Sequence, residues 1–289
     1  MKKYKIFSPA KINLTLEIVG KLPNGFHELR SLVYKAENLE DEIELIVDEK
    51  KRGIKIICND KSIPTDEKNI CWKIADKFFQ VSGKSAGLKI KIKKNIPALT
   101  GLGGGSSNGA AVLQILNKHF DYVLKNKQLI DLAGSIGKDI PLFLFPERAV
   151  IMTGAGEKIK PLKSFPHLNL ILINPHGEIG TAWAYGELDK RLRFMNDKRR
   201  ANITRKTAKD IQDGRTEGGI FYNDFDFLAE ELFPVIKELK NCLLAFGATG
   251  TSITGKGPTV FGLFKSRKDL LVACGFIEEK YPDFFVEIG

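Results

Sequence analysis

The segment between residues 97 and 107 carries the clearest chemical signal in this sequence. It reads Pro-Ala-Leu-Thr-Gly-Leu-Gly-Gly-Gly-Ser-Ser, follows a strand-like run at 88–93 and leads into a helical pattern at 106–118. Its glycines have no Cβ atoms to obstruct a ligand, and they permit positive φ. Backbone N–H groups of such a loop, together with the positive end of the following helix, bind anions well. We therefore expect a phosphate-binding loop here.

Two better-known nucleotide motifs do not fit this loop. No Gly-Lys-Ser or Gly-Lys-Thr follows at the spacing of the P-loop. The Gly-x-Gly-x-x-Gly pattern with an acidic residue about 20 positions later, which is typical of dinucleotide-binding folds, is also missing. The sequence thus indicates a phosphate site of another type.

Lys11 and Asp139 are candidates for the other groups that phosphoryl transfer needs. These are a cation near the transferred phosphate and a group that orients or deprotonates the acceptor hydroxyl. Lys11 lies in a strand-like run, where a lysine either faces solvent or reaches a partner. Asp139 precedes the apolar run Ile-Pro-Leu-Phe-Leu-Phe and is either a helix cap or a positioned base. The residue types alone leave these alternatives open.

The elements that must position these residues alternate irregularly. Helical patterns lie at 69–80, 106–118, 127–136, 226–241 and 267–280. Strand-like runs lie at 4–7, 12–19, 43–47, 54–58, 88–93, 149–153, 169–174 and 259–264. Pro234 predicts a kink or break in the fourth helical pattern. Because the early strands come in adjacent pairs with helices afterwards, we expect an α+β fold rather than a doubly wound parallel sheet.

A composition break at 161–166, with two prolines and no clear periodicity, predicts a boundary between two domains. We place the first domain at residues 1–163 and the second at residues 164–289. Within the second domain, the polar stretch 190–220 contains three glycines. It predicts a helix end followed by a mobile loop.

Composition excludes several classes of protein. The chain has 289 residues, of which 43% are hydrophobic and 28% charged, a balance typical of globular proteins. No apolar run approaches the roughly 20 residues that span a bilayer, and the N-terminus lacks the pattern of a secretory signal. Four isolated cysteines without zinc or redox spacing predict reduced thiols. We expect a cytoplasmic protein that does not contact membranes.

The net charge of +10 is concentrated in one stretch. Between Lys190 and Lys206, eight basic residues accompany a single acidic residue. Such charge is typical of proteins that bind nucleic acid, a membrane surface or an acidic ligand such as a phosphate, so a non-enzymatic nucleic-acid-binding protein is one alternative. Apart from Phe194, no aromatic residue is interleaved with these cations, and no nucleic-acid motif is recognised. We therefore expect a solvated face and no nucleic-acid partner, while a monomer and a homodimer both stay open.

The glycine loop resembles the phosphate-binding motif of the GHMP kinases, a superfamily of small-molecule kinases that includes galactokinase, homoserine kinase and mevalonate kinase. Other similar segments follow in family order between residue 8 and about residue 264. They are Ser8-Pro-Ala-Lys-Ile-Asn-Leu14, Gly20-Lys-Leu-Pro-Asn-Gly-Phe-His-Glu-Leu29, Gly137-Lys-Asp-Ile-Pro-Leu-Phe143, Gly154-Ala-Gly-Glu157 and Asn223-Asp-Phe225. The opening block is similar to one branch of the family, whose substrate carries a cytidine diphosphate group. The resemblance implies a two-domain GHMP kinase fold with the active site in the cleft between the domains.

The resemblance also implies an ATP-dependent phosphotransferase of non-mevalonate isoprenoid synthesis, which phosphorylates a hydroxyl of this small-molecule substrate. Lys11 and Asp139 match the catalytic pair of the family. The positions that match the ATP site are Asn69, Lys94, Pro97, Gly101, Leu102, Gly103, Gly104, Gly105, Ser106 and Ser107. Ser107 is in addition a candidate ligand of Mg²⁺.

For the substrate, the resemblance implies aromatic rings stacked on the cytosine and polar contacts to its edge. Phe26 matches a stacking position that is usually tyrosine, and Tyr185 matches a second one in the segment that Thr181 begins. His27 matches a histidine that hydrogen-bonds the cytosine edge, and Asn13 an asparagine near the sugar alcohol. A kinase for homoserine or a mevalonate derivative is the alternative, and the group Asn13, Phe26 and His27 argues against it.

Two departures from the family pattern affect the loops. Leu99 stands where the family usually has glycine, so we expect the first turn of the glycine loop to differ. The third family motif, usually Ser-Gly-Ser-Gly, reads Thr254-Gly-Lys-Gly257 here. Lys256 therefore adds a cation near the expected phosphates.

Overall fold

The computed structural model describes residues 1–191, 203–216 and 221–289 and divides the chain into two compact units. The first unit comprises Met1–Ala10, Leu39–Ala98 and Gly103–Pro146, and the second Lys11–Asn38, Leu99–Leu102 and Glu147–Gly289. These units are not the contiguous halves 1–163 and 164–289 expected from composition. The strands β1 (Lys2–Lys21) and β2 (His27–Asp48) each contribute residues to both units, so no single cut in the sequence separates them.

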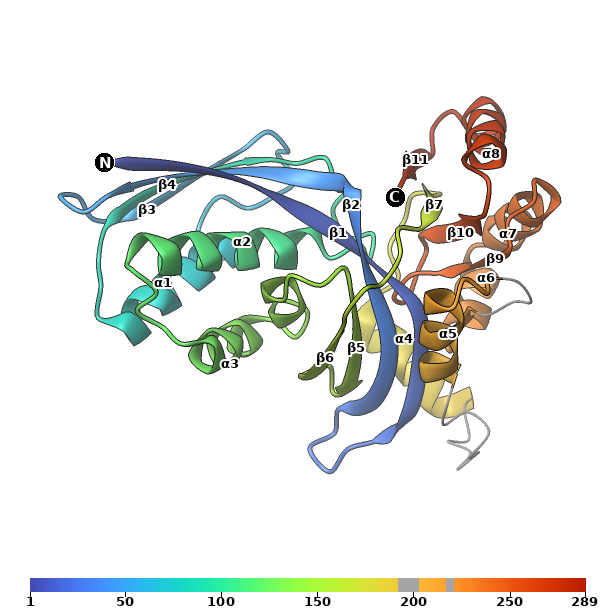
Figure 1. Ribbon diagram of the computed structural model, residues 1–289, viewed down its shortest axis with the longest axis horizontal. Coiled ribbons are helices and arrows are strands. Elements are labelled where there is room, and N and C mark those ends of the chain that lie inside the picture. Colours follow the sequence, from blue (N-terminus) through green and yellow to red (C-terminus); the bar gives the residue numbers. More distant parts are fainter. Residues whose placement is uncertain (192–202, 217–220) are drawn as a thin grey trace. The chain divides into compact units, whose positions relative to one another are not determined.

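The first unit is a sheet with helices on one face (Figure 1). Its strands follow the order β3 (Ile54–Cys58), β4 (Gly87–Lys93), β2 and β1. Strand β4 pairs antiparallel with β2 and parallel with β3. In β2 the side chains of Ile43, Leu45 and Val47 are buried, whereas Glu44 between them bonds Lys3 and Lys91. Because side chains alternate between the two faces of a strand, one face of the sheet packs against the core and the other faces solvent.

Three helices pack in the first unit: α1 (Ile70–Ser82), α2 (Gly104–His119) and α3 (Asn126–Ile136). Helix α1 ends at Gly83, whose φ of +68° is the left-handed conformation that glycine adopts without strain. Helix α2 approaches α1 closely at Gly109, where an added Cβ would lie 2.7 Å from Ile70 Cγ2. Small residues therefore set the position of α2, the helix that follows the glycine loop.

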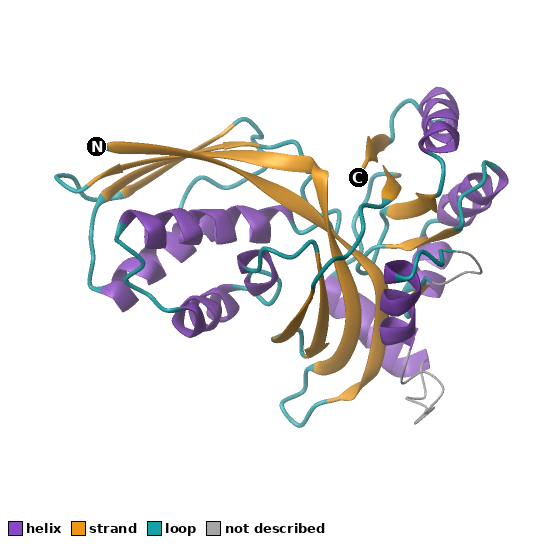
Figure 2. Cartoon of the chain, viewed as in Figure 1, coloured by secondary structure: helices purple, strands orange, loops and turns teal. Residues whose placement is uncertain are grey.

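The second unit contains two groups of strands (Figure 2). In one, β2 pairs antiparallel with β5 (Ala149–Gly154), β5 with β6 (Lys158–Leu162), and β1 parallel with β8 (Tyr222–Asn223). The other follows the order β11 (Phe285–Ile288), β7 (Asn169–Asn174), β10 (Val260–Phe264) and β9 (Gly250–Ile253). The helices are α4 (Thr181–Arg191), α5 (Ile203–Gln212), α6 (Asp226–Leu232), α7 (Val235–Ala245) and α8 (Arg267–Lys280). Helix α7 packs on β9 and β10, and α8 packs on β7, β10 and β11.

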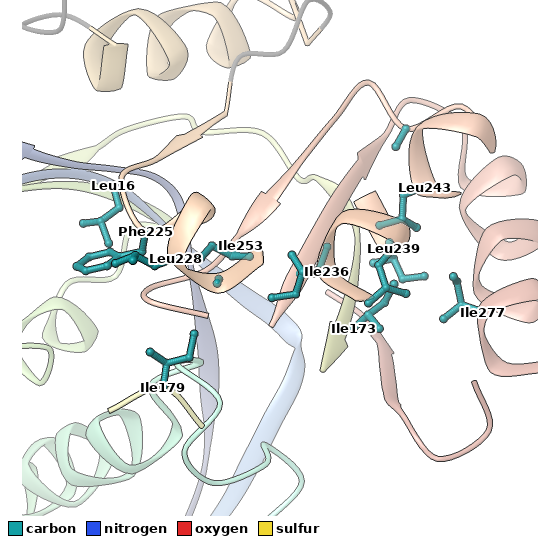
Figure 3. Packing of buried hydrophobic residues seen from close by; sticks show 14 of the residues in the cluster. Leu16, Ile173, Ile179, Phe225, Leu228, Ile236, Leu239, Leu243, Ile253 and Ile277 are labelled. Atoms are coloured by element: carbon teal, nitrogen blue, oxygen red, sulfur yellow. The ribbon is translucent and has the colours of Figure 1, made fainter. Parts of the chain in front are cut away.

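One apolar cluster fills the second unit (Figure 3). It joins Ile173 of β7 to Leu239 and Leu243 of α7 and to Ile277 of α8, all of which are inaccessible to solvent. Phe225, at the start of α6, extends the cluster towards β1. Burial of several complete aliphatic side chains, each of which contributes about 1.5–3 kcal/mol, makes this cluster the main stabilising feature of the unit.

The expected α+β class is confirmed, and so is the break at Pro234, which separates α6 from α7. In the stretch 190–220, the expected helix end is found at Arg191, where α4 ends, but residues 203–212 form helix α5 instead of a loop. Thr204 in its first turn binds the buried carboxylate of Glu17, which accepts from the Thr204 N–H at 3.0 Å. The expected mobile loop falls largely on residues 192–202 and 217–220, which lie outside the described residues, as do four of the eight cations between 190 and 206.

Two further expectations concern membranes and thiols. Within the described ranges, no helix is long and apolar enough to cross a membrane. All four cysteines are free thiols, as the sequence predicted. Burial raises the pKa of the Cys71 thiol to about 12, so this side chain is an inert part of the core.

Candidate active site

The N-terminus of α2 is the part of the first unit that best fits an anion. Gly103 precedes the helix with a φ of +71°, and its carbonyl accepts from the Ser107 N–H at 3.0 Å. Gly104 is buried, Gly105 is exposed and Ser106 is partly exposed. The Ser107 hydroxyl is buried and has no hydrogen-bond partner among the described residues. Its surroundings suit a phosphate oxygen or a metal ion, because buried polar atoms normally have a partner.

Lys94 lies beside this helix N-terminus. A Cβ added to Gly104 would come within 2.8 Å of the Lys94 ammonium and 3.0 Å of the Ile96 side chain. The ammonium donates to Asp41, whose carboxylate is fully buried and also accepts from the N–H groups of Asn95 and Ile96. Asp41 thus balances the Lys94 charge, and a side chain at position 104 would have to displace the Lys94 ammonium.

The other predicted residues of the first unit occupy turns and a helix cap. Asn69 is the N-cap of α1, where its side chain accepts from the Cys71 N–H at 2.8 Å and donates to the Pro64 carbonyl at 2.6 Å. Pro97 lies between β4 and the glycine loop. Asp139 is partly buried in the turn 138–140 and does not take the N-cap position of the following 3-10 helix Pro141–Leu144, which is Ile140.

In the second unit, Lys11 and Asn13 form the centre of a buried polar chain. Lys11 is only 6% exposed, so the interpretation as a solvent-facing strand residue is wrong. Its ammonium donates to Asn13 Oδ1 at 2.5 Å, and Asn13 Nδ2 donates to the hydroxyl of Ser31 at 2.8 Å. That hydroxyl donates onward to the carbonyl of Thr15 at 2.6 Å. A chain of this kind fixes the position of the ammonium.

Two loops pack against this part of β1. The Lys11 N–H donates to the Leu102 carbonyl at 2.8 Å, and the Asn13 N–H donates to the Thr254 hydroxyl at 2.9 Å. Gly101 has a φ of +79°, and a Cβ there would lie 3.3 Å from the Thr254 carbonyl oxygen. The first half of the glycine loop and the third family motif therefore meet beside Lys11.

Both departures from the family pattern have structural consequences. Leu99 has a φ of +62° with its side chain 69% exposed, which is the left-handed conformation that glycine would adopt without strain. The Lys256 ammonium donates to the carbonyl of Ile179. Burial lowers the pKa of Lys256, against the smaller opposing effect of Glu178.

His27 and Tyr185 lie together in the second unit, with ring centroids 4.6 Å apart and planes tilted by 32°. The Tyr185 ring also meets Phe225 edge-on at 5.0 Å. His27 Nε2 lies 2.6 Å from Asp189 Oδ1, and the Lys21 ammonium donates to the same carboxylate at 2.7 Å. The hydrogen bonds from His27 and Lys21 lower the pKa of Asp189, which keeps it ionised.

The structure therefore brings several predicted residues together within each unit. Lys94, Gly104 and Ser107 gather at the start of α2, and Lys11, Asn13, Gly101 and Leu102 gather along β1. His27 and Tyr185 are in contact, whereas Phe26 is 54% exposed and Thr181 is exposed at the start of α4. The functional roles of these residues stay predictions.

Three further polar residues of the site were missed by sequence reasoning. The alternation Leu39, Asp41, Ile43 placed Asp41 on the buried face of its strand, and this signal was available. Ser31 gave no comparable signal. Asp189 follows Tyr185 by one helical turn, but α4 itself was not predicted.

Comparisons with known proteins identify the family of the chain. Residues 69–146 match the GHMP kinases N terminal domain, and residues 201–283 match the GHMP kinases C terminal model. The chain is 36% identical over 279 residues to 4-diphosphocytidyl-2-C-methyl-D-erythritol kinase of Geobacter sp. (strain M21), covering 96% of each chain.

Solved structures give the same result. A crystal structure of 4-(cytidine 5'-diphospho)-2C-methyl-D-erythritol kinase has a TM-score of 0.79 at 25% identity, covering 99% of this chain and 98% of that chain. Homoserine kinase from Cytophaga hutchinsonii has a TM-score of 0.77 at 20% identity, covering 100% and 94%, which reflects the shared fold.

Proposed function

The chain belongs to the GHMP kinase family, and we propose that this phosphotransferase transfers the γ-phosphate of ATP to the 2-hydroxyl of 4-diphosphocytidyl-2-C-methyl-D-erythritol. The observation that carries the proposal is the chain-long similarity to a kinase of that name. The contact between His27 and Tyr185 supports it, because an imidazole beside an aromatic ring suits a nucleobase. A kinase whose acceptor substrate has no nucleobase would not need this pair of rings.

On the donor side, the α2 N-terminus holds the ATP phosphates in this proposal. The backbone of Gly103, Gly104 and Gly105 allows close approach, and the Ser107 hydroxyl accepts or donates a hydrogen bond at the phosphate end. ATP supplies the phosphoryl group that is transferred. In this proposal Asn69 and Lys94 lie around the adenine of ATP. The Lys94 ammonium also lies next to Gly104, in the first turn of α2.

Mg²⁺ is the proposed metal, with Ser107 as its ligand from the protein. No cluster of three His, Cys, Asp or Glu side chains occurs within the described ranges. In kinases Mg²⁺ keeps several waters and is bound by few protein ligands together with the phosphate oxygens of the substrate. Bound there, the ion would neutralise charge on the phosphates.

On the acceptor side, Lys11 of the second unit and Asp139 of the first unit are the proposed catalytic pair. The Lys11 ammonium is fixed by Asn13 and provides positive charge for the transferred group. Asp139 orients the acceptor hydroxyl and accepts its proton. Asn13 contacts the sugar alcohol, while Phe26, His27, Thr181 and Tyr185 bind the cytidine end.

A coupled assay of ADP release tests the proposal. With ATP and Mg²⁺, we expect turnover of 4-diphosphocytidyl-2-C-methyl-D-erythritol and none of homoserine or mevalonate. Turnover of homoserine or mevalonate, without turnover of 4-diphosphocytidyl-2-C-methyl-D-erythritol, would overturn the assignment of the substrate. Filter binding of RNA and DNA at physiological salt should give no retention of either nucleic acid. The cytoplasmic location of the protein stays a prediction.

A further inference from the structure

Lys256 is a cation in the segment that matches the third family motif, where the resemblance implies a serine. It lies in the segment Thr254–Gly257, which is held against β1 by the bond from the Asn13 N–H to Thr254. The carbonyl of Gly255 accepts from Asn223 Nδ2 at 2.7 Å, which fixes the loop from its other side. The backbone that carries Lys256 is therefore well positioned.

The Lys256 ammonium is only partly compensated. It donates one hydrogen bond, to the neutral carbonyl of Ile179, and among the described residues no carboxylate forms an ion pair with it, although Glu178 exerts a weaker attraction. An ammonium has three N–H donors. Burial of such a charge is unfavourable unless it is paired, and the lowered pKa of Lys256 has this cause. The arrangement is suited to an anion.

The position of Lys256 indicates which anion. A Cβ added to the neighbouring Gly255 would lie 3.9 Å from the Lys11 ammonium and 3.8 Å from Asn13 Oδ1, the proposed sugar-alcohol end of the site. Its hydrogen-bond partner Ile179 precedes α4, which carries Tyr185 of the proposed nucleoside end. The segment that carries Lys256 thus lies beside the proposed sugar-alcohol end, and its ammonium bonds the residue two positions before the helix that carries the proposed nucleoside end. In the substrate proposed above, a diphosphate joins these two ends.

We propose that Lys256 binds a phosphate oxygen of the diphosphate group in the acceptor substrate. This inference rests on the proposed function, because that function supplies the substrate. It makes Lys256 a specificity residue, since a substrate without a diphosphate gains nothing from the cation.

Binding measurements separate this role from a structural one. For Lys256→Gln, we expect the affinity for CDP to fall about tenfold, as is typical of a lost charge-assisted hydrogen bond, while the affinity for cytidine stays unchanged. The Gln amide can still donate to Ile179, so a purely structural role predicts wild-type affinity for both ligands. Lys256→Arg should retain most of the CDP affinity. Lys268→Gln, which removes an exposed charge from α8, is the matched control and should leave both affinities unchanged.

Kinetics distinguish the two phosphate-containing ligands. Lys256→Gln should raise KM for the acceptor about tenfold and leave KM for ATP within twofold. A rise only in KM for ATP would overturn the assignment and place the cation at the nucleotide. If the wild-type protein turns over the cytidine diphosphate substrate but Lys256→Gln has unchanged KM values and CDP affinity, this inference alone fails. If the wild-type protein does not use that substrate, both proposals fail.

Discussion

His27 Nε2 and Asp189 Oδ1 lie 2.6 Å apart, which joins the residue after the turn between β1 and β2 to helix α4. Because Asp189 is ionised, its carboxylate only accepts, and His27 Nε2 must carry the proton. The imidazole is thereby held with one face beside the ring of Tyr185 at 4.6 Å. If His27 binds the cytosine as proposed, Asp189 acts through it as a positioning residue.

Replacement of Asp189 should therefore weaken substrate binding more than it slows turnover. For Asp189→Ala, we expect KM for the cytidine diphosphate substrate to rise about tenfold, with kcat within threefold, because the imidazole loses the bond that fixes it. Asp189→Asn retains an acceptor oxygen and should show a smaller rise. Steady-state kinetics with saturating ATP measures both effects.

Lys21→Met provides the control for Asp189. It removes the other partner of the carboxylate but leaves the bond to His27 intact. We expect KM to change less than twofold. If Lys21→Met were as damaging as Asp189→Ala, the carboxylate would act by anchoring the strand end rather than by orienting His27.

Asp139→Ala should abolish turnover while leaving ATP binding largely intact. Loss of a positioned base typically lowers the rate by about 10²–10⁴-fold. Calorimetric titration with a non-hydrolysable ATP analogue should give an affinity within threefold of the wild-type protein. Retained turnover would exclude Asp139 from the role of base, and loss of nucleotide affinity would indicate a structural role instead.

The spacing of apolar residues and the positions of prolines predicted much of the fold. Helix α8 begins and ends at the expected residues 267 and 280, and Pro234 marks the break between α6 and α7. Helix α5 was missed because its buried face is formed by Thr204, Thr207, Ala208 and Ile211, whose small or polar side chains give a weak apolar signal. The length of β2 was missed because charged and apolar residues mix in its first half.

The candidate site was predictable where local sequence carries the chemistry. The glycine loop and Lys11 stand in recognisable segments, and the structure places Lys11 against Leu102. Asp189 lies 162 residues from His27 in the chain, and Asp41 lies 53 residues before Lys94. Only the fold brings such partners together, so no local pattern could have assigned these pairs.

Leu99→Gly should stabilise the protein. Leu99 has a φ of +62°, a conformation that costs an L-residue about 1–2 kcal/mol, and its side chain is mostly exposed. Glycine removes this strain but loses about 0.5–1 kcal/mol through the greater freedom of the unfolded chain. We expect a net gain of about 0.5–1 kcal/mol in the free energy of unfolding by urea denaturation. Leu99→Ala keeps the Cβ atom and should give no gain; an equal gain would assign the effect to the exposed apolar side chain.

Lys35→Met should stabilise the protein at neutral pH but not at high pH. Lys35 is 6% exposed, and burial lowers its pKa from 10.5 to about 8, with smaller opposing effects of Glu147 and Glu37. Below pH 8 the folded protein bears the full cost of the buried charge, whereas above pH 10.5 the lysine is neutral in both states. The difference corresponds to at most about 3 kcal/mol.

The measurement is the free energy of unfolding of Lys35→Met and wild type between pH 7 and pH 11. The gain should be largest at pH 7 and should decline between pH 8 and pH 10.5, because the lowered pKa makes the neutral amine the favoured folded form. Lys237→Met removes an exposed lysine of α7 and should give a small difference that does not vary over this range. A gain for Lys35→Met that is independent of pH would indicate improved apolar packing instead of relief of a buried charge.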